Sequence, residues 1–185
     1  MAEQFEFELL FALPEGEHDP LDISNAVFEA GFEDALVGTG VPGLLGVELE
    51  EEGSDAEAVI LEAARKLLKA LPAGTSLREV RPDLVSLADV AERLNVKRQA
   101  LQQREMPLPS LGGLYRVDEV AVFLTKAMTP EASRRRPRFD LERASNWLRA
   151  GPAARLLNAR LTTRELDPVS VEYVAEKGRD KVAAG

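Results

Sequence analysis

Residues 85–124 carry a succession of local signals that constrains the fold more than any other stretch of this chain. Ser86 suits the N-cap of a short helix, because a serine hydroxyl accepts a backbone hydrogen bond there, and Asp89 follows at the third helical position. Asn95 tolerates the positive φ of a tight turn. Between them, apolar residues recur at the spacing of one helix face: Leu87, Val90, Ala91 and Leu94.

A second helix is predicted after this turn, over about residues 97–105. Ala100 and Leu101 are expected to face inward. The outer surface is then left with polar and cationic side chains: Lys97, Arg98, Gln99, Gln102, Gln103 and Arg104. Arginine or lysine can address guanine and glutamine can address adenine in the major groove, while other cations neutralise phosphates. The pattern therefore predicts a helix that reads DNA.

Two prolines, Pro107 and Pro109, end the second helix, because each lacks a backbone donor and disfavours helix in the residue before it. Gly112-Gly113 suits a hairpin turn, and residues 114–117 are predicted to return as the strand of a small wing. Asp118 is expected to cap a third helix, whose apolar residues are Val120, Ala121, Phe123 and Leu124. Helix, turn, helix, wing and helix form a winged helix-turn-helix.

The segments SLADVAERLNVKRQAL and GGLYRVDEVAVFL, with the proline-containing break between them, resemble the MerR-like and excisionase-like winged helix-turn-helix family over about 40 of the 185 residues. The resemblance implies that the second helix enters the major groove and that the wing touches the flanking backbone. It implies base-facing roles for Arg98, Gln99 and Gln102 and a phosphate contact for Arg116; Ser86 is counted with the DNA-binding residues. Lys97 stands where many members have a Ser or Thr cap, and the wing is short and poor in cations.

Charge is divided unevenly along the chain. The formal net charge is −9, but residues 1–83 carry 5 Lys/Arg against 19 Asp/Glu, a net of −14, while residues 84–185 carry 18 against 13, a net of +5. This asymmetry predicts an acidic half that faces a partner and a basic half that can approach phosphate. Within the basic half, four arginines fall within five residues, either as a solvated linker or as a contact to the DNA backbone or minor groove: Arg134, Arg135, Arg136 and Arg138.

The acidic half shows alternating strand patterns and two helical patterns. Strands are predicted over 4–12, 35–37, 44–49 and 75–80, and helices over 21–31 and 55–70, the latter capped by Ser54. The order βαββαβ predicts a ferredoxin-like two-layer sandwich, an antiparallel sheet with two helices on one face. Because this fold occurs in proteins of many functions, it does not by itself predict one. Dimerisation is favoured over the binding of a small effector.

Beyond residue 139 three short helices are expected, over about 140–150 and 153–164, separated by Gly151-Pro152, and from Pro168. Helices this short must pack on the body, on each other or on a second copy. The predicted class is therefore α+β in three regions: an acidic ferredoxin-like domain (1–82) for dimerisation or for partner or effector binding, a winged helix-turn-helix (83–128), and a basic linker with a helical C-terminal region (129–185).

The remaining residues argue against enzymatic chemistry. The absence of cysteine removes disulfides, zinc fingers and thiol catalysis. The single histidine, His18, lies in an acidic loop where solvation is favoured over metal binding, so no metal, cofactor or catalytic residue is predicted. No run of 18 apolar residues occurs and the N-terminus lacks the pattern of a signal peptide, so a cytoplasmic protein without membrane contact is expected.

Together these observations predict a sequence-specific transcriptional regulator, a repressor that binds double-stranded DNA as a homodimer through the helix at about 97–105. The alternative is a protein–protein adaptor, in which the acidic N-terminal domain docks a basic partner and DNA contact is non-specific. A three-helix unit with solvated Lys, Arg and Gln is compatible with both. Arg98, Gln99 and Gln102 discriminate between them, because only the regulator depends on these side chains.

Overall fold

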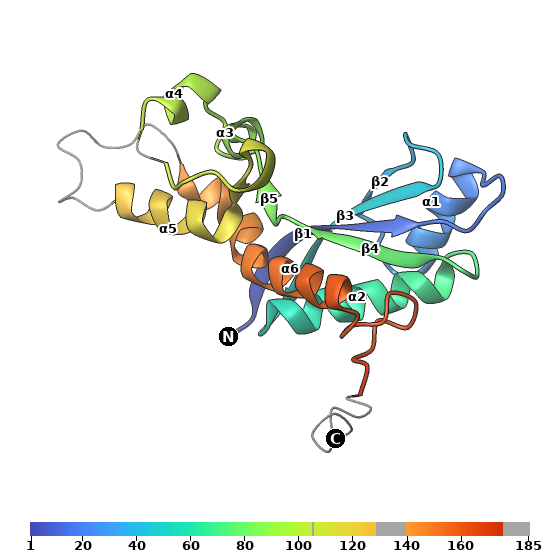
Figure 1. The fold of residues 1–185 in the computed structure, drawn as a ribbon. Helices are drawn as coiled ribbons and strands as arrows, with labels where there is room; N and C mark the ends of the chain where they lie inside the picture. The colour runs from blue at the N-terminus through green and yellow to red at the C-terminus, as the bar shows by residue number, and fades with distance from the viewer. Residues whose placement is uncertain (105, 129–139, 176–185) are drawn as a thin grey trace, which may run out of the picture.

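The computed structural model describes residues 1–104, 106–128 and 140–175. It is a mixed α+β protein with two lobes, a sheet lobe and a smaller helical lobe, visible in Figure 1. The sheet lobe contains the six elements expected of the acidic half, in the predicted order: β1 (Glu3–Ala12), α1 (Pro20–Glu29), β2 (Leu36–Gly38), β3 (Leu44–Gly53), α2 (Ala56–Ala70) and β4 (Ser76–Arg81).

The four strands form one sheet in the order β2-β3-β1-β4, and every neighbouring pair is antiparallel. β1 pairs with β3 along its whole length, from Glu3 opposite Gly53 to Ala12 opposite Leu44. Because side chains alternate between the two faces of a strand, the odd-numbered apolar residues of β1 share one face and are buried: Phe5, Phe7, Leu9 and Phe11. The even-numbered residues form the opposite face, called here the open face.

The buried face is covered by helices that begin at aspartate caps. The Asp19 side chain accepts a hydrogen bond from the Leu21 amide at the start of α1, and Asp55 accepts one from the Ala58 amide, 2.8 Å away, at the start of α2. The prediction that Ser54 caps the second helix is therefore wrong by one residue. Both helices send buried side chains into the core against β1, Ile23 and Val27 from α1 and Ile60, Leu61, Ala63, Ala64 and Leu67 from α2.

The helical lobe follows β4 and has a hydrophobic core of its own. Its elements are β5 (Leu84–Val85), α3 (Leu87–Arg93), α4 (Arg98–Gln102), the 3-10 turn η1 (Leu111–Gly113), β6 (Tyr115–Arg116) and α5 (Val117–Ala127). The core is formed by apolar residues of these elements and of the C-terminal helix described next, among them Val90, Leu94, Leu101, Val120 and Leu124.

One long helix, α6 (Ser145–Thr163), follows the short turn η2 (Leu141–Ala144) and belongs to both lobes. Its first turns place Trp147 and Leu148 in the helical-lobe core, and its later turns place Ala154 and Leu157 in the sheet-lobe core. The predicted break at Gly151-Pro152 is wrong, because Gly151 is buried within the helix and Pro152 is exposed on its surface. Burial at both ends of the helix outweighs the hydrogen bond that a proline removes.

The segment after α6 forms no helix from Pro168, contrary to the prediction. Leu166 instead forms an isolated antiparallel bridge with Tyr173, and Val171 is buried with a φ of 54°. This segment contacts α2 through Glu57, which accepts hydrogen bonds from the Tyr173 hydroxyl and from Arg160 at the end of α6. Placement of this segment thus depends on contacts distant in sequence, which local helical spacing does not report.

The outer edge of β4 is closed by the C-terminal part of the chain. The Asn158 side chain accepts a hydrogen bond from the Val80 amide and donates one to the Val80 carbonyl, both at 2.8 Å, and it also donates to Asp83. The Leu77 amide donates to the Pro168 carbonyl at 2.7 Å. An edge strand presents unpaired backbone groups, and here one amide side chain satisfies two of them at a fully buried residue.

Replacing Asn158 by alanine is expected to lower the free energy of unfolding by about 1–3 kcal/mol, because the Val80 backbone loses both partners. Urea unfolding followed by circular dichroism measures the loss. Asn158→Asp serves as the matched variant: it keeps the acceptor for the Val80 amide, loses the donors and adds a charge beside Asp83. We expect it to be at least as destabilising at neutral pH. Unchanged urea midpoints for both variants would contradict this role of Asn158.

Gly151 is expected to set the close approach of α6 to α5. A Cβ atom at this position would lie 2.3 Å from Cγ1 of Val117 and 3.4 Å from its Cβ. Gly151→Ala should therefore destabilise the protein by overpacking, about 1–3 kcal/mol before the gain in helix propensity. In a Val117→Ala background the clash is gone and the same change should stabilise by about 0.5–1 kcal/mol. A double-mutant cycle of urea unfolding tests this reversal of sign, and equal effects in both backgrounds would disprove it.

Candidate nucleic-acid interface

The α3 helix begins with the cap that the sequence predicts. The Ser86 hydroxyl accepts a hydrogen bond from the Asp89 amide at 3.2 Å, and the Asp89 carboxylate accepts one from the Ser86 amide at 2.7 Å. This reciprocal pair is a capping box, which satisfies two backbone donors at the start of the helix. Ser86, one of the predicted DNA-binding residues, thus has its side chain engaged at the helix start.

The turn between α3 and α4 is built on Asn95, as predicted. Its φ is 52°, the left-handed conformation. The Asn95 amide donates to the Glu92 carbonyl at 3.0 Å, and the Val96 amide donates to the Ala91 carbonyl at 2.9 Å. This is the hydrogen-bond pattern of a Schellman motif, which ends a helix sharply and satisfies its last carbonyls. The chain therefore leaves α3 abruptly, and α4 packs against it.

The α4 helix is shorter than predicted, Arg98–Gln102 rather than about 97–105. Leu101 is fully buried and anchors it to the lobe core, but Ala100, expected to face inward, is exposed. Two factors shorten the helix. Lys97 stands at the N-cap and makes no side-chain capping bond, and the amides of Gln103 and Arg104 already close the final turn on Gln99 and Leu101.

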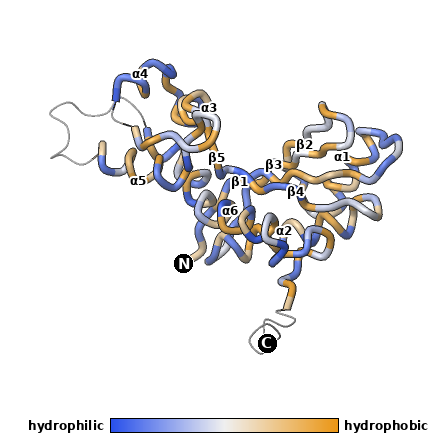
Figure 2. The backbone as a smooth tube through the Cα atoms, viewed as in Figure 1, coloured by the Kyte–Doolittle hydropathy of each residue, from blue (hydrophilic) through white to orange (hydrophobic). Residues whose placement is uncertain are grey.

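The predicted base-reading residues lie together on the outer surface of this helix. Arg98 and Gln102 are four residues apart and Gln99 and Gln102 three apart, which places their side chains next to one another. These three side chains are exposed, and so are Lys97 and Gln103 beside them, whereas Arg104 is half-buried. Figure 2 shows α4 as a hydrophilic stretch at the extremity of the helical lobe.

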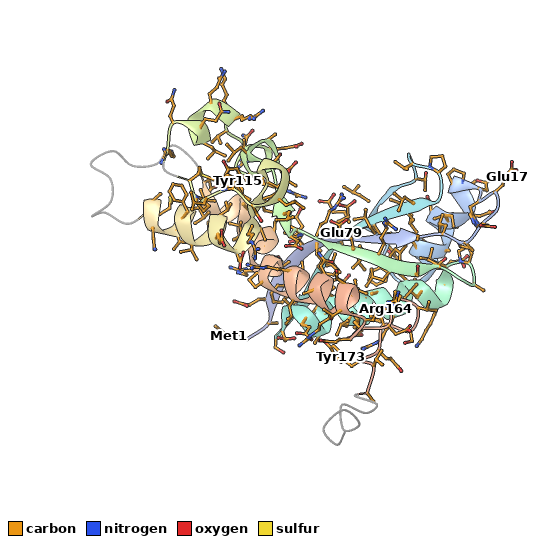
Figure 3. The ribbon with its side chains drawn as sticks, in the orientation of Figure 1. Met1, Glu17, Glu79, Tyr115, Arg164 and Tyr173 are labelled. Carbon is orange, nitrogen blue, oxygen red and sulfur yellow. The ribbon has the colours of Figure 1, made fainter. Side chains whose placement is uncertain are left out.

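The segment predicted as a wing has a different local structure. Gly112 and Gly113 have φ of 63° and 76°, but they belong to a 3-10 turn rather than to a two-residue hairpin. The returning strand is only Tyr115–Arg116, and it pairs with β5, with Arg116 opposite Leu84. Figure 3 marks Tyr115 within the helical lobe. The half-buried Arg116 also stands at the N-cap of α5, a place predicted for Asp118.

Asp118 lies in the first turn of α5 and pairs with α6. Its Oδ2 accepts a hydrogen bond from Arg155 at 2.6 Å, and because α5 begins at Val117, Asp118 lies inside the helix rather than at its N-cap. The predicted DNA-contacting residues Arg134, Arg135 and Arg136, with Arg138, lie outside the described residues.

Arg93, which the sequence analysis missed, connects α3 to the open face of the sheet. Its guanidinium donates to Glu6 of β1 and to Glu48 of β3, the latter at 2.5 Å, and lies 5.5 Å from the centre of the Trp147 ring. No signal could have identified it, since these partners are 87, 45 and 54 positions away in sequence. A cation of the α3–α4 unit is thus used within the protein.

Burial and charge act in opposite directions on the pKa values of the groups at this contact. Burial raises the pKa of Glu6 above 4.5, and the neighbouring Glu48 and Glu50 raise it further, while Arg93 acts in the opposite direction. Burial alone would lower the pKa of Arg93, but hydrogen bonds and charge from Glu48 and Glu6 raise it overall. The guanidinium therefore remains protonated and holds two carboxylates that would otherwise repel each other.

Among residues 1–104, 106–128 and 140–175, no group of three or more acidic, histidine or cysteine side chains is arranged to hold a metal ion. His18 has Nε2 2.9 Å from the Pro14 carbonyl oxygen. None of the helices in these ranges is long and apolar enough to cross a membrane. Comparison of the chain with protein-family models, curated protein sequences and solved structures gives no match.

Arg93→Ala is expected to lower the free energy of unfolding by about 1–3 kcal/mol at neutral pH, because Glu6 and Glu48 lose their shared cation. The pKa of Glu6 is already raised in the folded state, so folding is favoured as pH falls toward that pKa. Without Arg93 this pKa rises further, and the deficit should shrink between pH 7 and about pH 5. Urea unfolding at both pH values measures it, with Arg93→Lys as the charge-preserving control. A deficit independent of pH would contradict the role of the carboxylate pair.

Proposed function

We propose that this protein is a sequence-specific transcriptional regulator that binds double-stranded DNA with α4 in the major groove. The observation that carries the proposal is the exposed cluster of Arg98, Gln99 and Gln102 on a helix anchored by the buried Leu101. Arginine recognises guanine and glutamine recognises adenine through paired hydrogen bonds in the major groove. The Schellman turn at Asn95 supports the proposal further, because it fixes the direction of α4 relative to α3.

We also propose a specific architecture for each of the three regions of this α+β protein. The sheet order β2-β3-β1-β4, with helices on one face, supports a ferredoxin-like sandwich in region 1–82. The α3–α4 pair with the β5–β6 pairing supports a winged helix-turn-helix in region 83–128. In region 129–185, α6 supports a structural role, since it packs in both cores.

The mechanism we propose is repression by a homodimer in the cytoplasm, through occlusion of a promoter, without catalysis or a cofactor. A symmetric dimer would present two α4 helices to half-sites about one DNA turn, roughly 34 Å, apart. Five residues of helix limit each copy to a few base contacts, so two copies would be needed for a site of useful length. The charge asymmetry between the two halves of the chain supports an orientation with the basic half toward phosphate.

Selection of duplexes from a random DNA pool by the purified protein, at near-physiological salt, tests the proposal. An enriched motif with two half-sites is the expected outcome, and the half-site spacing would report the geometry of the dimer. No enrichment, with all binding abolished as salt rises, would indicate a non-specific electrostatic contact. That result would overturn the regulator and favour the adaptor.

The triple variant Arg98→Ala, Gln99→Ala, Gln102→Ala is expected to lose specific binding while the fold survives, because the three side chains are exposed. Removal of each bidentate hydrogen-bonded pair with a base should cost about 1–3 kcal/mol of discrimination. Fluorescence anisotropy with the selected duplex and a scrambled duplex measures both affinities. Lys69→Ala, on the exposed surface of α2, removes the same net charge and is the control. Equal binding of the selected duplex by the triple variant and the control would show that α4 does not read bases.

A further inference from the structure

A groove of about 1150 Å³ separates the open face of the sheet from the helical lobe. Its walls carry carboxylates from the sheet (Glu8, Glu48, Glu79) and from α3 (Asp89, Glu92). Figure 3 marks Glu79 between the two lobes. Apolar side chains stand among these charges, including Leu36, which is 68% exposed, and Leu84, which is 38% exposed. The residues of α4 do not line the groove, so it is separate from the surface proposed to read DNA.

The groove already holds two arginines of the protein itself, each between two carboxylates. Arg93 donates to Glu6 and Glu48 and lies over the Trp147 ring. Arg81 lies 3.2 Å from a Glu79 oxygen through Nε and 3.4 Å from a Glu8 oxygen through Nη1. The planar guanidinium matches carboxylate geometry and stacks on aromatic rings, which an ammonium group does less well. The surroundings are therefore shaped for guanidinium groups.

Charge remains unbalanced after these pairs are made. The residues that line the groove include five carboxylates against three guanidiniums, a net of −2: Glu8, Glu48, Glu79, Asp89 and Glu92 against Arg81, Arg93 and Arg143. The Glu92 carboxylate is exposed and has no ion-pair partner among the described residues. Two copies meeting through this face would oppose like charges, which is unfavourable. The surface thus favours a basic partner of a different sequence.

We propose that this groove docks an arginine-bearing segment of a partner protein. Arginine side chains of the segment bind the exposed carboxylates of the groove, Glu92 foremost and Glu79 beside Arg81, while its apolar residues cover Leu36 and Leu84. Electrostatic complementarity of this kind steers encounter and selects the partner. The interaction is additional to DNA binding and does not depend on it.

The single tryptophan of the chain gives a direct readout, because Trp147 lines the groove. The probe is an eight-residue peptide of alternating arginine and leucine, blocked at both ends, added to the full-length protein in the absence of DNA. We expect a saturable change in Trp147 emission. The same peptide with lysine for arginine should bind about three- to tenfold more weakly, since it loses the planar contacts.

Two charge-matched double variants locate the site. Glu79→Gln with Glu92→Gln removes two groove carboxylates, and Glu29→Gln with Glu33→Gln removes two exposed carboxylates from α1 and the residues after it. The groove variant should bind the arginine peptide about three- to tenfold more weakly and the control variant as tightly as the unmodified protein. Equal weakening in both variants would show only long-range attraction to an acidic protein and would overturn the proposal. So would equal affinity for the arginine and lysine peptides, or a failure of the arginine peptide to bind.

These outcomes are independent of the regulator proposal. Peptide binding is read without DNA, and the variants leave Arg98, Gln99 and Gln102 unchanged. Urea unfolding of each variant confirms that the fold is retained, because the four substituted glutamates are at least partly exposed. If the protein binds the arginine peptide but enriches no DNA motif, the docking proposal stands and the regulator proposal is overturned. If it enriches a DNA motif but does not bind the peptide, the regulator proposal stands and the docking proposal is overturned.

Discussion

The relative placement of the two lobes depends on the burial of one helix in two cores. Trp147 and Leu148 of α6 pack with the helical lobe, and Ala154 and Leu157 pack with the sheet. Burying apolar surface is the main favourable term in folding, roughly 25 cal/mol per Å². A change in the angle between the lobes would therefore expose apolar surface at one end of α6 or at the other. Gly151, which allows the helix to approach Val117 closely, is the point where this constraint is tightest.

Charged contacts also connect α6 to α5 and the helical lobe to the sheet. Arg155 pairs with Asp118 of α5, and Arg93 of α3 reaches Glu6 and Glu48 on the sheet. The side chains of these three ion pairs are 20–35% exposed, so each pair is partly shielded from solvent. Of these cations only Arg93 reaches the sheet, whereas Arg98 and its glutamine neighbours on α4 are exposed.

Sequence reasoning performed best where structure is decided locally. The alternation of apolar residues in β1, the serine cap of α3 and the left-handed turn at Asn95 depend on neighbours within a few positions, and the structure has all three. It failed where distant contacts decide. The continuity of α6 through Pro152 depends on two cores, and the extent of β6 depends on its pairing with β5. For the candidate site, the exposure of Arg98, Gln99 and Gln102 could be predicted, while the role of Arg93 could not, because its partners come from β1, β3 and α6.

The proposed DNA-reading surface and the proposed peptide groove share one structural element. Arg93 lies in the wall of the groove and also ends α3, and the turn at Asn95 connects it directly to α4. A segment bound to Glu92, the neighbour of Arg93 in α3, would act on the helix that leads into α4. Coupling between two ligands must be reciprocal, so a partner that weakened DNA binding would itself be released by DNA. Coupling also requires that the partner bind two arrangements of α3 with different affinities. The burial of α6 in both cores opposes large movement of the lobe, so any such difference must arise from a small rotation of α3 about the Arg93 contact.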